Sequence, residues 1–89
     1  MKVEFTHKFI KIYKKRFSSN INLRKRFDQK LRRFVEDPND KILAVHSLSG
    51  KLKGYRAFSV TGDIRVIYYI NKGIAYFVDI GTHNQVYGG

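Results

Sequence analysis

The chain has 89 residues, no cysteine and a formal net charge of +11. The lack of cysteine excludes disulfide bonds and thiolate metal sites, and the length predicts a single domain over residues 1–89. No apolar run approaches the roughly 20 residues that a membrane-spanning helix needs, so a cytoplasmic protein without membrane contact is expected.

Positive charge is concentrated in the first part of the chain. Residues 1–35 hold twelve of the eighteen lysines and arginines but only two acids, whereas residues 36–89 hold six bases and five acids. This imbalance favours binding to a polyanion, and nucleic acid is the expected partner. An acidic protein partner, an anionic membrane and a plain solvated surface are the alternatives.

Two basic helices are predicted after a short strand that contains Val3 and Phe5. Thr6 and Asn20 suit the N-cap positions of the helices, because their side chains accept hydrogen bonds from free backbone N–H groups. The proline in residues 37–40 ends the second helix. The apolar faces of the two helices comprise Phe9, Ile10, Tyr13 and Phe17, then Leu23, Phe27, Leu31, Phe34 and Val35.

The second part of the chain predicts an antiparallel β meander, which makes the fold class α+β with both helices packed on one face of the sheet. Residues 55–60, 63–70 and 74–80 are rich in aromatic and β-branched residues and are separated by glycine-containing turns. A two-residue turn at residues 61–62 would set Phe58 opposite Arg65. A three-residue turn at residues 71–73 would set Arg65 opposite Asp79.

Alternation along the strands then divides the sheet into two faces. The face expected under the helices carries Ile64, Val66, Tyr68, Ile70, Ile74, Tyr76, Val78 and Ile80. The face expected to contact RNA or a protein partner carries Arg56, Phe58, Arg65, Ile67, Tyr69, Phe77 and Asp79. Cations mixed with aromatic rings suit phosphate contact and base stacking.

The candidate residues for chemistry gather at the end of the last strand and on this second face. His83 follows the strand end, where a side chain is held firmly yet reaches solvent, and histidine transfers protons near neutral pH. His46 lies in the connection before the meander. Arg56 and Arg65 are expected on neighbouring strands, where two guanidinium groups could clamp a phosphate. The alternative for Arg65 is an ion pair with Asp79.

Three blocks of the sequence resemble the RelE/ParE toxin superfamily, and in particular the YafQ-like branch of RelE-type mRNA interferases. The blocks are residues 46–56, residues 63–70, and residues 79–83 followed by Tyr87. The resemblance implies a RelE-like architecture and the toxic partner of a type II toxin–antitoxin pair. It also implies an endoribonuclease without metal or other cofactor that cleaves mRNA in the ribosomal A site. Its partners would be mRNA, the ribosome and a cognate antitoxin, with one toxin monomer in the complex.

The resemblance also assigns roles to particular residues. His83, His46 and Asp63 fall where the YafQ-like branch has acid–base and RNA-contacting residues, and Arg65 falls on the arginine used against the scissile phosphate. The resemblance also makes Arg56 and Tyr87 substrate contacts, and Lys53 and Phe77 are expected to contact the substrate beside them. The chain departs from the pattern at Ser59, where the branch has a histidine, and at Ile64, where it has an aromatic residue.

Two other functions are compatible with the same sequence. A ParE-like toxin would poison DNA gyrase by binding and would not need His83, Arg56 and Arg65 on one face. A basic nucleic-acid-binding module would show salt-sensitive binding without toxicity.

Overall fold

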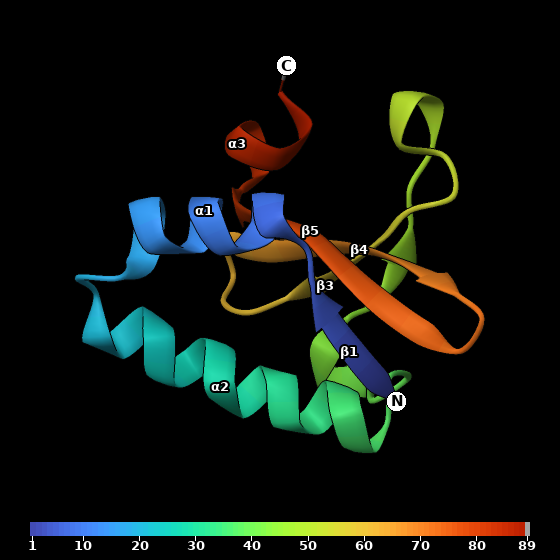
Figure 1. Cartoon of the computed structure of the whole chain (residues 1–89), viewed down its shortest axis with the longest axis horizontal. Coiled ribbons are helices and arrows are strands. Elements are labelled where there is room, and N and C mark those ends of the chain that lie inside the picture. The colour runs from blue at the N-terminus through green and yellow to red at the C-terminus, as the bar shows by residue number, and fades with distance from the viewer. Residues whose placement is uncertain (89) are drawn as a thin grey trace.

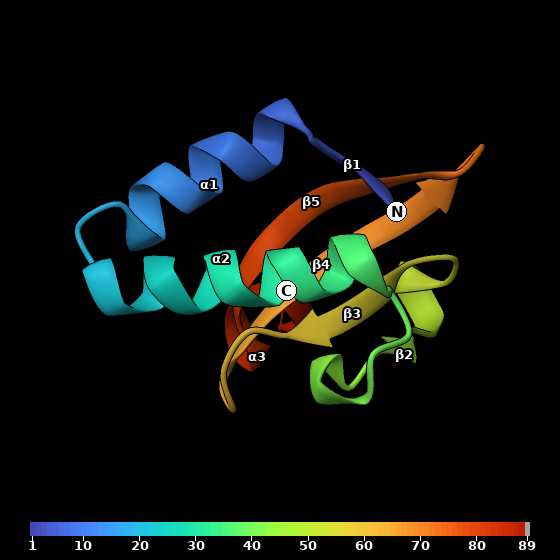
Figure 2. The same cartoon turned by 90° about the horizontal axis from the view of Figure 1, so that it is seen from below.

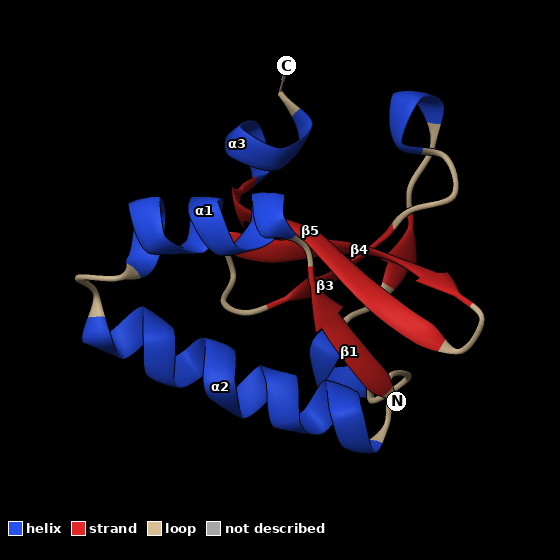
Figure 3. Ribbon diagram, viewed as in Figure 1, coloured by secondary structure: helices blue, strands red, loops and turns tan. Residues whose placement is uncertain are grey.

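The computed structural model describes residues 1–88 and has α+β architecture (Figures 1 and 3). Its strands are β1 (Lys2–Phe5), β2 (His46–Ser47), β3 (Arg56–Ser59), β4 (Ile64–Asn71) and β5 (Ile74–Thr82). Its helices are α1 (His7–Phe17), α2 (Ile21–Glu36) and α3 (His83–Tyr87), with short 3-10 turns η1 (Lys41–Leu43) and η2 (Gly50–Leu52). None of the helices in residues 1–88 is long and apolar enough to cross a membrane.

All five strands form one mixed sheet in the order β1-β5-β4-β3-β2. The meander of β3, β4 and β5 is antiparallel, as predicted, and β1 adds to its edge in parallel with β5. The two-residue strand β2 pairs with β3 at the opposite edge. The sequence did not indicate β2, because a two-residue strand carries no periodic pattern.

The two long helices begin at the predicted caps. The Thr6 hydroxyl accepts a hydrogen bond from the Phe9 backbone N–H at 3.2 Å, and the Asn20 side chain accepts one from Leu23 N–H at 3.1 Å. Thr6 also donates to the Phe77 carbonyl at 2.8 Å, which joins the start of α1 to β5. The helices run in opposite directions and α2 crosses one face of the sheet (Figure 2).

An aromatic core lies between these helices and the sheet. Phe34 of α2 stacks on Phe58 of β3 and meets Tyr68 and Phe77 edge-on, with ring centroids 4.9 to 5.4 Å apart. Phe9 of α1 also meets Phe77. Burial of these large rings supplies much of the driving force for folding in so short a chain.

The predicted register is wrong by one residue at both turns of the meander. Phe58 pairs with Val66, and Arg65 pairs with Ser59 and Gly81. At the second turn Asn71 pairs with Ile74, so the turn has two residues, Lys72 and Gly73, both with positive φ (51° and 79°). Such a turn matches the right-handed twist of the strands.

A β-bulge changes the faces of β5. The register shifts between Ile67 and Tyr68, and on β5 the extra residue is Val78, since Phe77 pairs with Tyr68 and Asp79 with Ile67. Phe77 and Ile80 therefore both point into the core, while Val78 and Asp79 line a cavity on the other face. The shorter β4–β5 turn and the bulge make the predicted core positions Ile74, Tyr76 and Val78 wrong, together with the predicted open-face position Phe77. The predicted open-face position Phe58 is wrong because of the changed register between β3 and β4.

Candidate functional site

A cavity of ≈ 480 Å³ opens on the sheet face away from α2. In Figure 1, α3 and the yellow-green turn η2 both rise from the sheet on this side. We call this space the histidine cavity. It is lined by His46, Ser47, Leu48, Ser49, Lys51, Leu52, Arg65, His83 and Tyr87. Four of the predicted site residues, His46, Arg65, His83 and Tyr87, therefore lie around one space although they are spread over 42 residues of sequence.

Helix α3 fixes His83 and Tyr87 on one side of the cavity. Thr82 is its N-cap and forms a capping box, in which Gln85 N–H donates to the Thr82 hydroxyl (3.2 Å) and Thr82 N–H donates to Gln85 Oε1 (2.8 Å). Positions four apart share one face of a helix. The His83 and Tyr87 rings accordingly meet edge-to-face, with centroids 4.6 Å apart.

Arg65 lies on β4 beneath Tyr87. Its guanidinium carbon is 5.9 Å from the centre of the Tyr87 ring, within reach of a cation–π attraction. Nε of Arg65 and the hydroxyl of Tyr87 are buried, and neither has a hydrogen-bond partner within residues 1–88. An unsatisfied buried polar atom costs free energy, so these two atoms make this part of the cavity wall an unusual polar site in the fold.

His46 faces these residues from β2. Its Nδ1 lies 3.3 Å from the Ala44 carbonyl, and with a proton on Nδ1 this contact is a hydrogen bond that leaves Nε2 free as a base. Ala44 has positive φ (49°) and ends η1, which turns the chain toward β2. Both histidines are exposed, so a ligand in the cavity can reach them.

The cavity has a cation that sequence analysis missed. Lys51, on the turn η2, lines it, whereas Lys53 lines a separate hollow with Tyr55 and Tyr69. The resemblance marked the whole stretch of residues 46–56. It could not decide between the two lysines, because the 3-10 turn at Gly50–Leu52 sets which of them faces the histidines.

Three other expected site residues lie elsewhere. Phe77 is 0% exposed in the aromatic core, so its predicted contact with substrate is wrong. Arg56 pairs with Tyr68, on the opposite face from Arg65, so the predicted arginine clamp is wrong too. Burial raises the pKa of the Tyr68 hydroxyl, and nearby Arg56 partly opposes that shift.

Asp63 is exposed in the β3–β4 turn, where its N–H donates to the Thr61 hydroxyl (3.2 Å), and it does not line the cavity.

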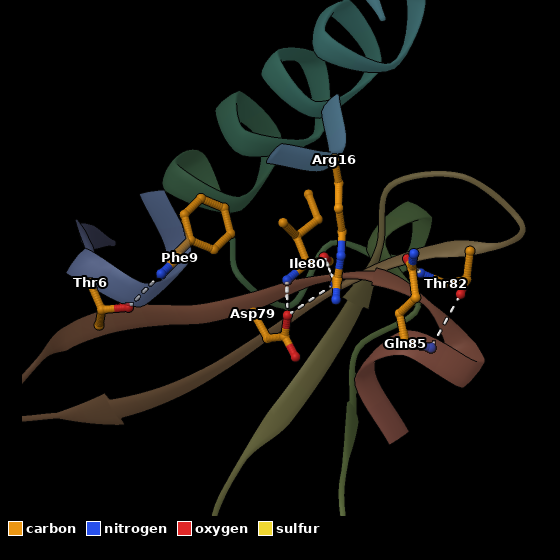
Figure 4. Close-up of polar contacts among 7 residues, drawn as sticks. All are labelled: Thr6, Phe9, Arg16, Asp79, Ile80, Thr82 and Gln85. Carbon is orange, nitrogen blue, oxygen red and sulfur yellow. Dashed lines mark hydrogen bonds and ion pairs between the residues drawn. The ribbon is translucent and has the colours of Figure 1, made fainter. Parts of the chain in front are cut away.

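Arg16 joins α1 to the strand that carries α3 (Figure 4). Its Nη1 donates to the Ile80 carbonyl at 2.7 Å and lies 3.4 Å from Asp79 Oδ1. The ion pair of Asp79 is therefore with Arg16, and the predicted alternative of an Arg65–Asp79 pair is wrong. Gly81 makes room for this contact, since a Cβ there would lie 2.5 Å from Arg16 Nη1 and 2.6 Å from Gln85 Oε1.

Solved structures of bacterial toxins share this fold. A crystal structure of YafQ from E. coli strain BL21(DE3) matches with a TM-score of 0.70 and 23% identity over 98% of each chain. A YoeB/ParE toxin from Agrobacterium tumefaciens matches with a TM-score of 0.75 and 16% identity, over 93% of this chain and 99% of that one. The fold is thus that of the RelE-like toxins, as expected.

The sequence itself carries the more specific assignment. Residues 1–88 match the family model described as the bacterial toxin YafQ of type II toxin–antitoxin systems. The chain belongs to this YafQ toxin family. The toxin in the E. coli DinJ–YafQ complex is similar to it at 25% identity over 98% of each chain, with a TM-score of 0.65. Among curated protein sequences no relative matches this chain.

Proposed function

We propose that this toxin is an endoribonuclease that cleaves mRNA at the histidine cavity without a metal ion. The 2′-oxygen of RNA would attack the adjacent phosphorus as the bond from phosphorus to the 5′-oxygen breaks, leaving a 2′,3′-cyclic phosphate and a free 5′-hydroxyl. One histidine would accept the proton of the 2′-OH and the other would donate a proton to the leaving oxygen. His46 and His83, exposed around one cavity, supply two groups for these transfers.

Arg65 is the group proposed to stabilise the transition state. The observation that carries the proposal is the position of Arg65, which lines the histidine cavity with both histidines and has its guanidinium carbon 5.9 Å from the centre of the Tyr87 ring. A phosphate oxygen in the cavity would pair with this guanidinium, and the attraction would strengthen as charge develops on the phosphoryl oxygens. Lys51 would add a second positive charge, and the buried Tyr87 hydroxyl would donate to or accept from the ribose or phosphate.

The cellular partners follow from the family and the charge. Solved complexes of related toxins hold an antitoxin, as in E. coli DinJ–YafQ and Staphylococcus aureus YoeB–YefM. A cognate antitoxin is therefore proposed to neutralise this toxin. Residues 1–35 hold twelve lysines and arginines and only two acidic residues, a charge that suits contact with ribosomal RNA. This charge supports the proposal that mRNA is cleaved in the ribosomal A site.

The test is primer extension on a reporter mRNA with translating ribosomes. Wild type is expected to cut the message, and His83→Ala and His46→Ala are each expected to abolish the cuts while keeping the circular dichroism spectrum. His7→Ala is the matched control, because His7 is exposed at the start of α1 and does not line the cavity. If folded wild type left the mRNA intact and expressing cells accumulated double-strand breaks in their DNA, the result would instead assign a ParE-like action on DNA gyrase.

A further inference from the structure

Two further hollows continue from the histidine cavity across the open face of the sheet. A second cavity of ≈ 260 Å³ shares Leu52 with the histidine cavity, and a third of ≈ 450 Å³ shares Tyr55 with the second. Their floor includes alternate residues of β4, namely Arg65, Ile67 and Tyr69. Alternate residues of a strand point to the same face about 7 Å apart, so the three hollows form one track along β4.

The far end of the track is an aromatic platform. The rings of Tyr69 and Tyr76 stack with centroids 5.1 Å apart and 19° between their planes, and Tyr55 meets Tyr69 edge-on at 5.6 Å. All three tyrosines are half-buried and so present part of each ring to solvent. Exposed aromatic rings in a row are the sites on which unpaired bases stack.

The charges along the track suit a polyanion. Each hollow has one lysine in its wall, Lys51 in the first, Lys8 in the second and Lys53 in the third. Asp79 is the one acid that lines any of them, and its carboxylate is paired with Arg16. Cations beside aromatic and apolar surface match the phosphates and bases of a single strand.

We propose that this track binds the single-stranded RNA that adjoins the cleaved bond, with a base held on the tyrosine platform of Tyr55, Tyr69 and Tyr76. The inference rests on the proposed endoribonuclease function, since it takes the histidine cavity as the start of the RNA path. It adds a binding subsite at a distance from the reacting phosphate, which gives affinity for the strand and acts on no bond.

The test compares RNA probes of two lengths. Fluorescence anisotropy would give Kd for 2′-O-methyl oligonucleotides, which lack the nucleophile and cannot be cut, of about three and about nine nucleotides. The double variant Tyr55→Leu/Tyr69→Leu keeps apolar bulk but removes two rings. It is expected to weaken binding of the long probe about 5- to 150-fold for each base stack lost and to leave the short probe unchanged.

Two controls separate stacking from folding. Tyr55→Phe/Tyr69→Phe retains the rings and is expected to bind both probes as wild type does. Tyr13→Leu alters a half-buried tyrosine that packs against Phe9 and Phe27 in the helical layer, so it reports a general loss of packing. Lys53→Gln should make long-probe binding less dependent on salt, by about one unit of log–log slope.

The outcomes distinguish the two proposals. Equal loss for both probes, or unchanged binding of the long probe, would overturn the platform even where wild type still cuts mRNA through His83. Loss of affinity for the antitoxin with unchanged long-probe binding would overturn it too, and assign the tyrosines to the antitoxin. Absence of ribosome-dependent cleavage by folded wild type would defeat the proposed function itself, whatever the probes do.

Discussion

Nη1 of Arg16 donates to the carbonyl of Ile80 at 2.7 Å, and this contact joins α1 to the end of β5, just before His83. The bond lies where the chain leaves the sheet to form α3, whose first residue is His83. Arg16 is therefore a positioning residue, which holds the strand end from the helical layer and does not line the histidine cavity.

Arg16→Met should loosen this attachment. The loss of a charged hydrogen bond should lower the free energy of unfolding by about 1–2 kcal/mol, measured by urea denaturation. Cleavage should fall because α3 is less firmly held, with kcat reduced more than KM is raised. Lys15→Met, at the exposed neighbouring position, is the control and should change neither value. If Arg16→Met lowered stability but kept full kcat, the hydrogen bond would stabilise the fold without positioning the site.

Arg65→Met should lower activity without lowering stability. Cleavage should fall about 100- to 1,000-fold, as for loss of a donor that stabilises a transition state. Stability should stay the same or rise, because the variant removes a buried Nε that has no partner in residues 1–88. Initial cleavage rates and thermal melting measure the two effects. A clear drop in Tm would show that Arg65 stabilises the fold through contacts other than these.

Gly81→Ala should strain the junction between β5 and α3. The added Cβ would meet Arg16 Nη1 at 2.5 Å and Gln85 Oε1 at 2.6 Å, so both side chains must move. The expected loss of stability is about 1–3 kcal/mol, with a loss of cleavage as the capping box opens. At Gly62 a Cβ would meet no atom within 4 Å, and Gly62→Ala is the matched control. Equal melting temperatures for the two variants would contradict this account.

Asp40 should make stability fall in acid. The Ile42 backbone N–H donates to its carboxylate, Arg33 donates to it as well, and these bonds lower the pKa of Asp40 below its usual 3.8. A carboxylate with a lowered pKa stabilises the fold above that usual value and loses its contribution as the pH falls through the lowered one. Urea midpoints at about pH 6 and about pH 3 should therefore differ less in Asp40→Asn than in wild type. Arg33→Met keeps the hydrogen bond from Ile42 and should retain part of the fall in stability between these two pH values. An Asp40→Asn protein that loses as much stability in acid as wild type would show that Asp40 is not its cause.

The sequence predicted the elements well because their signals are local. Thr6 and Asn20 cap the two helices as expected, and Phe9, Phe17, Phe27 and Phe34 all lie in the core. The order of strands in the meander also followed from short turns. His46, Arg65, His83 and Tyr87 were predicted to act together, and they line one cavity.

The errors come from features that periodicity does not encode. Positive φ at Lys72 made the second turn one residue shorter than predicted, and a one-residue change of register reverses the face of every side chain. The bulge at Val78 reverses the faces again within β5, which is why Ile80 was placed correctly and Phe77 was not. Arg56 was misplaced because the β3–β4 turn is one residue longer than predicted, which changes the register of β3.

The parallel pairing of β1 with β5 sets an order on biosynthesis. Lys2 pairs with Ile74, so β1 finds its neighbour only after more than seventy further residues have been translated. β5 lies between β1 and β4, and α3 follows it. The nascent chain thus lacks both the strand that joins β1 to the meander and His83 until residues 74–83 have been translated. A toxin built in this order has no complete histidine cavity until the segment that carries His83 has been made.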